Sequence, residues 1–268
     1  MRKRRISYVG ALGLALAVAI PGTALATGTQ NLNAGFTAKN NAAITFGKNA
    51  SLSKKFSTKG TLRVRVFLTS ILGTPPGSDV VNIDFPEEMK FTTKGLDTCT
   101  AAEIASKSSA DAKAACPKAI VGAGTASANL GPGLDVSGPV DAFNGPKSGA
   151  NPTILLHSNA AAPITLNGTL IDSPLGSPFG KRLNVPVAVP EGPVPAGIAI
   201  TDFDTTVSAK IKSSKRADAT ASKKKKKKKK KTYVSAKCTD GTLSYGSTFD
   251  YLPPDADQAP TYEQTCTK

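Results

Sequence analysis

Turn residues recur at short intervals from residue 119 onward, and this recurrence constrains the fold more than any other feature of the chain. Pairs such as Asn144-Gly145 and Asn167-Gly168 separate runs that are rich in β-branched and other apolar residues. Turn signals at a spacing of about 8–12 residues are typical of all-β domains and argue against an α/β fold. The sequence therefore predicts an all-β fold, an antiparallel β-sandwich of immunoglobulin-like or jelly-roll type. The expected strands span residues 119–128, 136–143, 153–158, 164–171, 182–189, 197–201, 207–211, 233–238 and 242–251.

The clearest single strand lies earlier, at residues 61–69. Its apolar residues alternate strictly with Arg63 and Arg65, which is the period of two expected for a half-buried strand. Residues 80–85 follow a Pro-Gly turn and are expected to pair with this strand in antiparallel fashion. Two shorter edge strands are predicted further upstream, at 33–38 and 43–46.

The N-terminus has the pattern of a secretory signal peptide. Four basic residues precede an apolar run from Val9 to Ile20, and small residues follow at Ala24 and Ala26. Cleavage is expected after Ala26. A membrane anchor is the alternative, but the apolar run has roughly 12 residues where about 20 are needed to span a bilayer. The chain is therefore divided into a signal peptide (1–26), an N-terminal edge segment (27–59) and a β-domain (60–268), and the mature chain is expected to be secreted or held at the cell surface.

Four cysteines form an even set, which in an exported chain indicates two disulfides. Three connectivities are open, and we favour Cys99–Cys116 with Cys238–Cys266 because each pair is close in sequence. One short helix is expected between the first two cysteines, over residues 100–107, where Thr and Glu have the spacing of a capping box. The chain has no Cys-x-x-Cys and only one histidine, so no metal site and no cofactor are predicted.

Positive charge is concentrated in one segment. The formal net charge is +15, but residues 210–231 hold thirteen Lys or Arg and a single Asp, and the rest of the mature chain carries −1. Adjacent ammonium groups repel one another and stay hydrated, so residues 212–232 are expected to form a disordered loop. Its nine consecutive lysines are the candidate polyanion-binding residues: Lys223, Lys224, Lys225, Lys226, Lys227, Lys228, Lys229, Lys230 and Lys231.

Clustered lysines attract anionic polymers, and the expected partner is an anionic cell-envelope polymer or polysaccharide. No aromatic residue interleaves the run, which argues against base stacking and a specific nucleic-acid site. The alternative is a solvated low-complexity loop that has no partner.

Several motifs resemble a family of uncharacterised exported proteins from high-GC actinobacteria. They are Cys116-Pro117, Val121-Gly-Ala-Gly-Thr-Ala126, Phe143-Asn-Gly145, Leu155-Leu-His157, the stretch from Val185 to Pro190, and Tyr233 to Gly241 followed by Cys266. The resemblance covers roughly residues 60–268 and implies a secreted, mostly-β, disulfide-containing protein with no assigned activity. The chain departs from that pattern at Leu243, where a Trp is expected, and in the length of its lysine run.

The sequence has no Gly-x-Ser-x-Gly elbow, no P-loop, no Rossmann glycine pattern and no His-Glu-x-x-His. His157 is the only histidine and lies in an alternating strand, so it is interpreted as a hydrogen-bonded residue on a sheet face and not as a catalytic base. The carboxylate pairs Glu87-Glu88 and Asp202/Asp204, and the acids at 250, 255 and 257, are expected at strand ends or turns as solvated side chains.

The sequence predicts a non-catalytic secreted or cell-surface structural or interaction protein, tethered to anionic envelope polymers by its lysine loop. The alternative is a carbohydrate- or matrix-binding module. Such a module would use Tyr245, Tyr251 and Tyr262, which cluster near the second disulfide.

Overall fold

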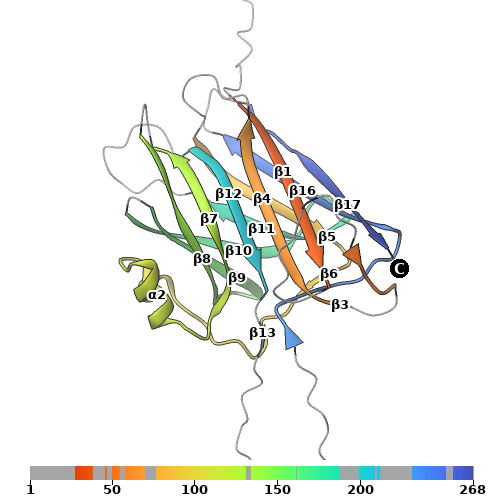
Figure 1. The fold of residues 1–268 in the computed structure, drawn as a ribbon, viewed down its shortest axis with the longest axis horizontal. Helices are drawn as coiled ribbons and strands as arrows, with labels where there is room; N and C mark the ends of the chain where they lie inside the picture. The colour runs from red at the N-terminus through yellow and green to blue at the C-terminus, as the bar shows by residue number, and fades with distance from the viewer. Residues whose placement is uncertain are drawn as a thin grey trace, which may run out of the picture.

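The computed structural model of the chain describes residues 28–38, 46, 50–54, 58–69, 77–130, 134–160, 162–187, 199–208, 210–211, 231–251 and 256–267. These residues lie mostly in strands, with two short helices, so the predicted all-β class is confirmed (Figure 1). The elements are β1 (Thr29–Thr37), β2 (Ala50–Ser51), β3 (Thr58–Lys59), β4 (Thr61–Thr69), β5 (Ser78–Pro86), β6 (Met89–Phe91), α1 (Ala101–Ile104), α2 (Ser109–Ala115), β7 (Ile120–Asn129), β8 (Asp135–Ser148), β9 (Asn151–Asn159), β10 (Pro163–Asp172), β11 (Phe179–Pro186), β12 (Ala199–Val207), β13 (Lys210–Ile211), β14 (Lys231–Thr232), β15 (Val234–Ala236), β16 (Thr242–Tyr251) and β17 (Thr261–Thr267).

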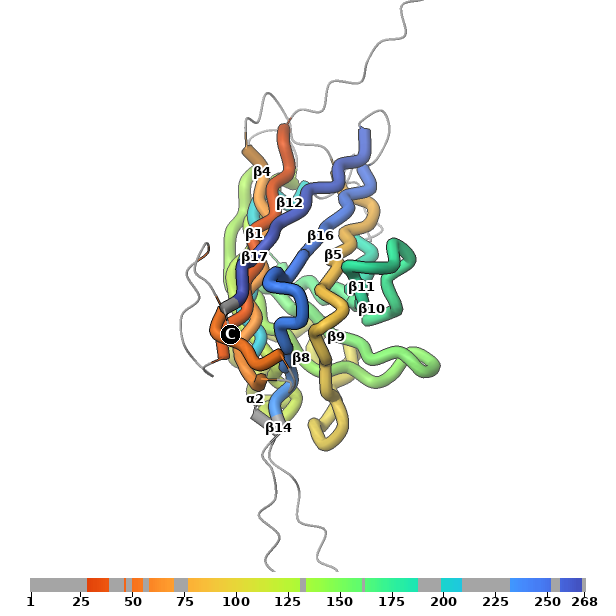
Figure 2. Tube along the Cα trace, turned by 90° about the vertical axis from the view of Figure 1, so that its right-hand side faces the viewer, coloured from red at the N-terminus to blue at the C-terminus, as the bar shows by residue number. Residues whose placement is uncertain are grey.

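Twelve strands form one sheet in the order β1-β4-β12-β7-β8-β9-β10-β11-β5-β16-β17-β2. Neighbouring strands pair antiparallel, except that β17 and β2 pair parallel over two residues. The sheet curls until its two ends meet, so that β4 and β12 lie across the core from β5 and β11 (Figure 2). Because both layers belong to one nearly closed sheet, the immunoglobulin-like or jelly-roll sandwich type stays a prediction.

The two ends of the sheet are joined by glutamine side chains. The Gln264 amide from β17 accepts a hydrogen bond from the Phe36 backbone N–H at 2.8 Å and donates one to the Phe36 carbonyl at 3.0 Å. Gln258 bonds in the same way to the N–H of Gln30 and to the carbonyl of Gly28. A primary amide has the same donor and acceptor as a peptide unit, so these side chains substitute for a strand ladder along the seam.

Residues 99–116 form an excursion that covers the outer face of β8 and β9. Phe143 and Leu155 point outward from these strands, yet both are fully buried because they pack against Ile104 and Ala112 of the excursion. The predicted helix is present as α1, with the Thr100 N–H and hydroxyl both donating to the Glu103 carboxylate. The second helix, α2, was not predicted.

The predicted pairing of residues 80–85 with residues 61–69 is wrong. Strand β4 pairs with β1 and β12, whereas β5 pairs with β11 and β16. The apolar rows of β4 and β5 face each other across the core, so their shared periodicity reflects packing and not a hairpin.

Other boundaries differ from the predictions in detail. Val207 ends β12 and does not begin a new strand, β11 begins at Phe179 and ends at Pro186, and β17 was not predicted. The strand predicted at 43–46 lies outside the described residues, apart from Phe46. Among the residues that the structure describes, no helix has the length and hydrophobicity needed to span a bilayer.

Candidate functional site

The lysine segment leaves the body between two short paired strands. Lys210 pairs with Thr232 and Ile211 with Lys231, so β13 and β14 bring both ends of residues 212–230 together beyond the end of β12 (Figure 1). The predicted polyanion-binding residues Lys223 to Lys230, like most of the loop predicted at 212–232, lie outside the described residues. The hairpin base therefore fixes where this charge is attached to the body.

The C-terminal side of that base is fixed firmly in the core. The Thr232 hydroxyl donates to the Val234 carbonyl at 2.9 Å, and the side chain of Tyr233 is completely buried. The Tyr233 ring lies edge-on to Phe91 with the ring centroids 6.0 Å apart. Burial also raises the pKa of the Tyr233 hydroxyl far above its ordinary value. This side chain therefore acts as an apolar anchor immediately after the lysine segment.

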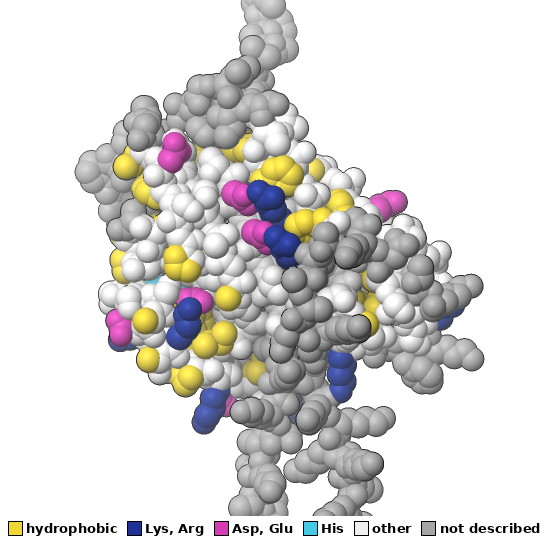
Figure 3. Space-filling model, in the orientation of Figure 1, with side chains coloured by type: hydrophobic (Ala, Val, Ile, Leu, Met, Phe, Trp, Pro, Cys, Tyr) yellow, Lys and Arg dark blue, Asp and Glu magenta, His cyan; other side chains and the backbone are white. Residues whose placement is uncertain are grey.

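Charged side chains on the outer face of β4 and β12 are paired with one another. On the outer face of β4 and β12, Arg65 bonds to Asp202 at 2.6 Å and Arg63 forms a bidentate pair with Asp204. The hydrogen bonds that the two arginines donate to these aspartates raise the pKa of both arginines. Among the described residues, acidic and basic side chains accordingly lie against each other on this face and form no patch of one sign (Figure 3). The surface of the body offers a polyanion far less attraction than nine consecutive lysines.

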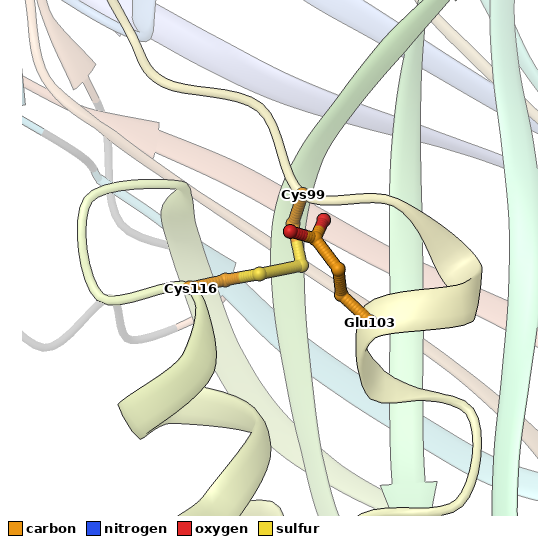
Figure 4. A group of neighbouring side chains, drawn as sticks. All are labelled: Cys99, Glu103 and Cys116. Carbon is orange, nitrogen blue, oxygen red and sulfur yellow. A yellow bond between two sulfur atoms is a disulfide. The ribbon is translucent and has the colours of Figure 1, made fainter.

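Both predicted disulfides are confirmed: Cys99 is bonded to Cys116, and Cys238 to Cys266. The Glu103 carboxylate lies beside the first disulfide (Figure 4). Three such groups close together can mark a metal site, but here both sulfurs are used in the S–S bond. Hydrogen bonds from the Thr100 backbone and hydroxyl lower the pKa of Glu103 and engage it as a helix cap. This cluster is a structural staple.

His157 is completely buried between the sheet and the excursion. Its Nδ1 lies 3.0 Å from the Thr165 hydroxyl, and its Nε2 lies 3.0 Å from the Lys107 carbonyl oxygen. The carbonyl can only accept, so Nε2 carries the proton and Nδ1 accepts from the hydroxyl. The interpretation of His157 as a hydrogen-bonded sheet residue agrees with this geometry, in which the ring ties the excursion to β9 and β10.

The predicted acidic residues are only partly where they were expected: Glu87 is exposed in the turn after β5, and Asp255 lies outside the described residues. Asp202 and Asp204 lie inside β12 and not at a strand end, and each is paired with an arginine. Glu88 is buried and accepts a hydrogen bond from the Thr239 hydroxyl. The side chain of Asp257 accepts from the Tyr251 backbone N–H at 3.1 Å. These contacts engage Asp202, Asp204, Glu88 and Asp257 as structural groups.

The tyrosines proposed as a sugar platform point into the core. Tyr245 is 0% exposed and Tyr251 is 6% exposed, so neither ring has a free face on which a sugar could stack. Tyr262 is partly buried and packs against the same core. The carbohydrate- or matrix-binding alternative stays a prediction, but it would need a surface other than these rings.

An apolar pocket lies between the layers at one end of the curled sheet. Its volume is about 90 Å³. It lies where β7 and β9 end and where β8, β10 and β12 begin, so it opens at the end of β12 opposite to the lysine segment. The sequence showed only an indirect signal for it, the glycines and alanines of β7. Its lining residues are Ala126, Ser127, Ala128, Leu130, Val136, Val140, Leu156, Ser158, Ala160, Ile164, Leu166, Val187, Ile200 and Phe203.

Comparison with known proteins identifies no relative. No protein-family model matches the chain, no curated protein matches it, and no solved structure matches its fold.

Proposed function

We propose that this protein is a non-catalytic exported protein whose neutral β-body is held on anionic cell-envelope polymers by its lysine segment. The predicted signal peptide carries the export step, and two disulfides suit an oxidising, extracytoplasmic compartment. The predicted sandwich-type body acts as the scaffold in this proposal, and its role is structural or in interactions with a partner outside the cell.

The β13–β14 pair is the observation that supports this proposal. Pairing at residues 210–211 and 231–232 holds both ends of the lysine segment at one end of the body. Thirteen basic residues are thereby attached at one point, while the remaining mature chain carries −1. A single strongly charged attachment point suits a tether, because the polymer can be bound at one end while the rest of the body's surface remains uncovered.

The expected interaction is strong at low salt and weak at high salt. Each lysine close to an anionic surface contributes roughly 1 kcal/mol before screening. The Debye length falls from about 10 Å at 0.1 M salt to about 3 Å at 1 M, so the attraction should be lost across that range. Lysine provides point charge without planar recognition, so many anionic polymers should bind in a similar way.

Retention of the mature chain on purified cell walls that carry phosphate-rich polymers tests this proposal. The protein should sediment with the walls at 50 mM salt and be released by 1 M salt. Replacing Lys223–Lys231 with serine should abolish retention, whereas replacing the nine lysines with arginine should preserve it. As a matched control, serine at the exposed body residues Lys90, Lys94 and Lys147 should leave retention nearly unchanged. Undiminished retention of the nine-serine variant would refute the proposal.

A further inference from the structure

We propose that the apolar pocket at the end opposite to the lysine segment is a binding site for an uncharged, chain-like apolar molecule that carries one hydrogen-bonding group. The class includes alkyl alcohols and the chain ends of neutral lipids. This inference is independent of the tether, because it concerns a different part of the molecule.

The pocket exists because inward-facing side chains are small on two of its walls. Ala126 and Ala128 of β7 pair with Phe203 and Ile200 of β12, and Ala160 follows the end of β9. Methyl groups at these positions leave unfilled the space that leucine or valine would occupy in a close-packed core. A hollow of about 90 Å³ is well above the space one water needs, which is about 10–15 Å³. The hollow is therefore large enough for several carbon atoms of a ligand.

The residues around the pocket disfavour a negatively charged ligand. No Lys, Arg, Asp or Glu belongs to the lining among the described residues. On the β7–β8 side of the pocket, the nearest charged residue along the chain is Asp135, the first residue of β8. Its carboxylate accepts a hydrogen bond from the Asn129 side chain at 2.9 Å. A carboxylate or phosphate head would meet this acid and find no cation in the wall, so an anionic lipid is disfavoured.

One polar group in the wall can orient a ligand. Ser158 lies on the inward side of β9, between Val140 of β8 and Ile164 of β10 in the register. Within the described part of the chain its hydroxyl makes no hydrogen bond, although it lines the pocket. A hydroxyl of this kind can both donate to and accept from a ligand alcohol or carbonyl. Ser158 is nearer than Leu156 to the end of β9, so the ligand's polar group should lie near the opening and its chain further in.

An exposed leucine adjoins this opening. Leu134 is 54% exposed, and its carbonyl accepts a hydrogen bond from the N–H of Leu130, which lines the pocket. An apolar side chain beside an apolar opening offers further contact to the part of a chain that the pocket cannot hold. The enclosed volume is smaller than the roughly 150 Å³ cavity that accepts benzene, so only the first few carbons are expected inside.

Calorimetric titration of the mature chain with 1-hexanol and with hexanoate tests the inference. Hexanol should bind at least tenfold more tightly than hexanoate at pH 7. Ala126→Phe should weaken hexanol binding at least tenfold, and Ala128→Leu provides a second filled variant if the first does not fold. Ala123→Phe, on the exposed outward side of the same strand, is the matched control and should leave binding unchanged.

Ser158→Ala should weaken hexanol binding about fivefold, the equivalent of one hydrogen bond, and should not affect hexanoate. Equal binding of hexanol and hexanoate would overturn the assignment of an uncharged ligand. Absence of hexanol binding, or binding that neither filled variant reduces, would overturn the site itself.

Discussion

The glutamine seam gives the sharpest prediction about stability. Replacing Gln264 with leucine keeps a side chain of similar size but removes both hydrogen bonds to Phe36. Phe36 is 1% exposed and Gln264 is 6% exposed, so water cannot take the place of the lost amide. The substitution should therefore leave one buried backbone N–H and one buried carbonyl without partners, and it also removes the oxygen that accepts a hydrogen bond from the buried Tyr245 hydroxyl at 3.4 Å.

The expected cost follows from the groups that lose a partner, chiefly the two backbone groups of Phe36. An unsatisfied buried donor or acceptor costs about 1–3 kcal/mol, and the leucine recovers part of this by burying more apolar surface. A net loss of about 2–4 kcal/mol is expected, which for a domain of this size corresponds to a fall in Tm of roughly 5–15 °C. Gln258→Leu should cost less, because that side chain is only half-buried and water can replace it.

Thermal unfolding and urea titration of the mature chain measure this difference, with Thr265→Leu on the exposed side of β17 as the control. Gln264→Glu extends the test, because a carboxylate accepts from the Phe36 N–H but repels the carbonyl, whereas the protonated acid can donate. That variant should gain stability as pH falls through the raised pKa of the buried acid. A Gln264→Leu protein as stable as its control would refute the role of the seam.

Three further predictions concern the acid near the C-terminus, the first disulfide and the buried histidine. Burial raises the pKa of Asp250, and the nearby Asp257 carboxylate adds to the rise, so the stabilising contribution of Asp250 is present below its unfolded pKa and lost as pH rises. In thermal scans, Asp250→Asn should therefore raise Tm at pH 7 and leave it unchanged at pH 3. Removing the Cys99–Cys116 bond, which spans 17 residues, should cost about 3 kcal/mol in urea titration and speed hydrogen exchange in the excursion, and unchanged exchange would contradict this. His157→Leu should cost about 2–4 kcal/mol because it leaves a backbone carbonyl and a hydroxyl without partners, whereas a stability equal to wild type would contradict the linking role.

Local features of the fold were predictable from the sequence, because local chemistry determines them. Strand β16 begins at Thr242 and ends at Tyr251 as predicted, and the disulfide pairs follow from proximity in the chain. Glycines and alanines inside a strand, as in β7, are typical of a bulge or of close backbone packing. Both are present: the register shifts between Ile120 and Gly122, and a Cβ at Gly124 would lie 1.9 Å from a backbone oxygen of β12.

Long-range features were not predictable, because they depend on which strands meet in space. Nothing in the alternation of residues 61–69 distinguishes a sheet neighbour from a strand across the core. Glutamines that close a seam look like any polar residues until β1 and β17 are placed side by side. The pocket likewise arises from small residues on one strand facing larger ones on another, so its volume belongs to no single segment.

Lysine footprinting tests the central claim, that one segment carries the interaction with anionic polymers, most directly. The mature chain would be acetylated at limiting reagent with and without cell-wall polymer at 50 mM salt, and each lysine's reactivity measured by mass spectrometry. The account predicts protection confined to Lys223–Lys231, lost at 1 M salt, with Lys90, Lys94 and Lys147 unaffected. Protection of those body lysines, with the segment as reactive as in the free protein, would contradict it.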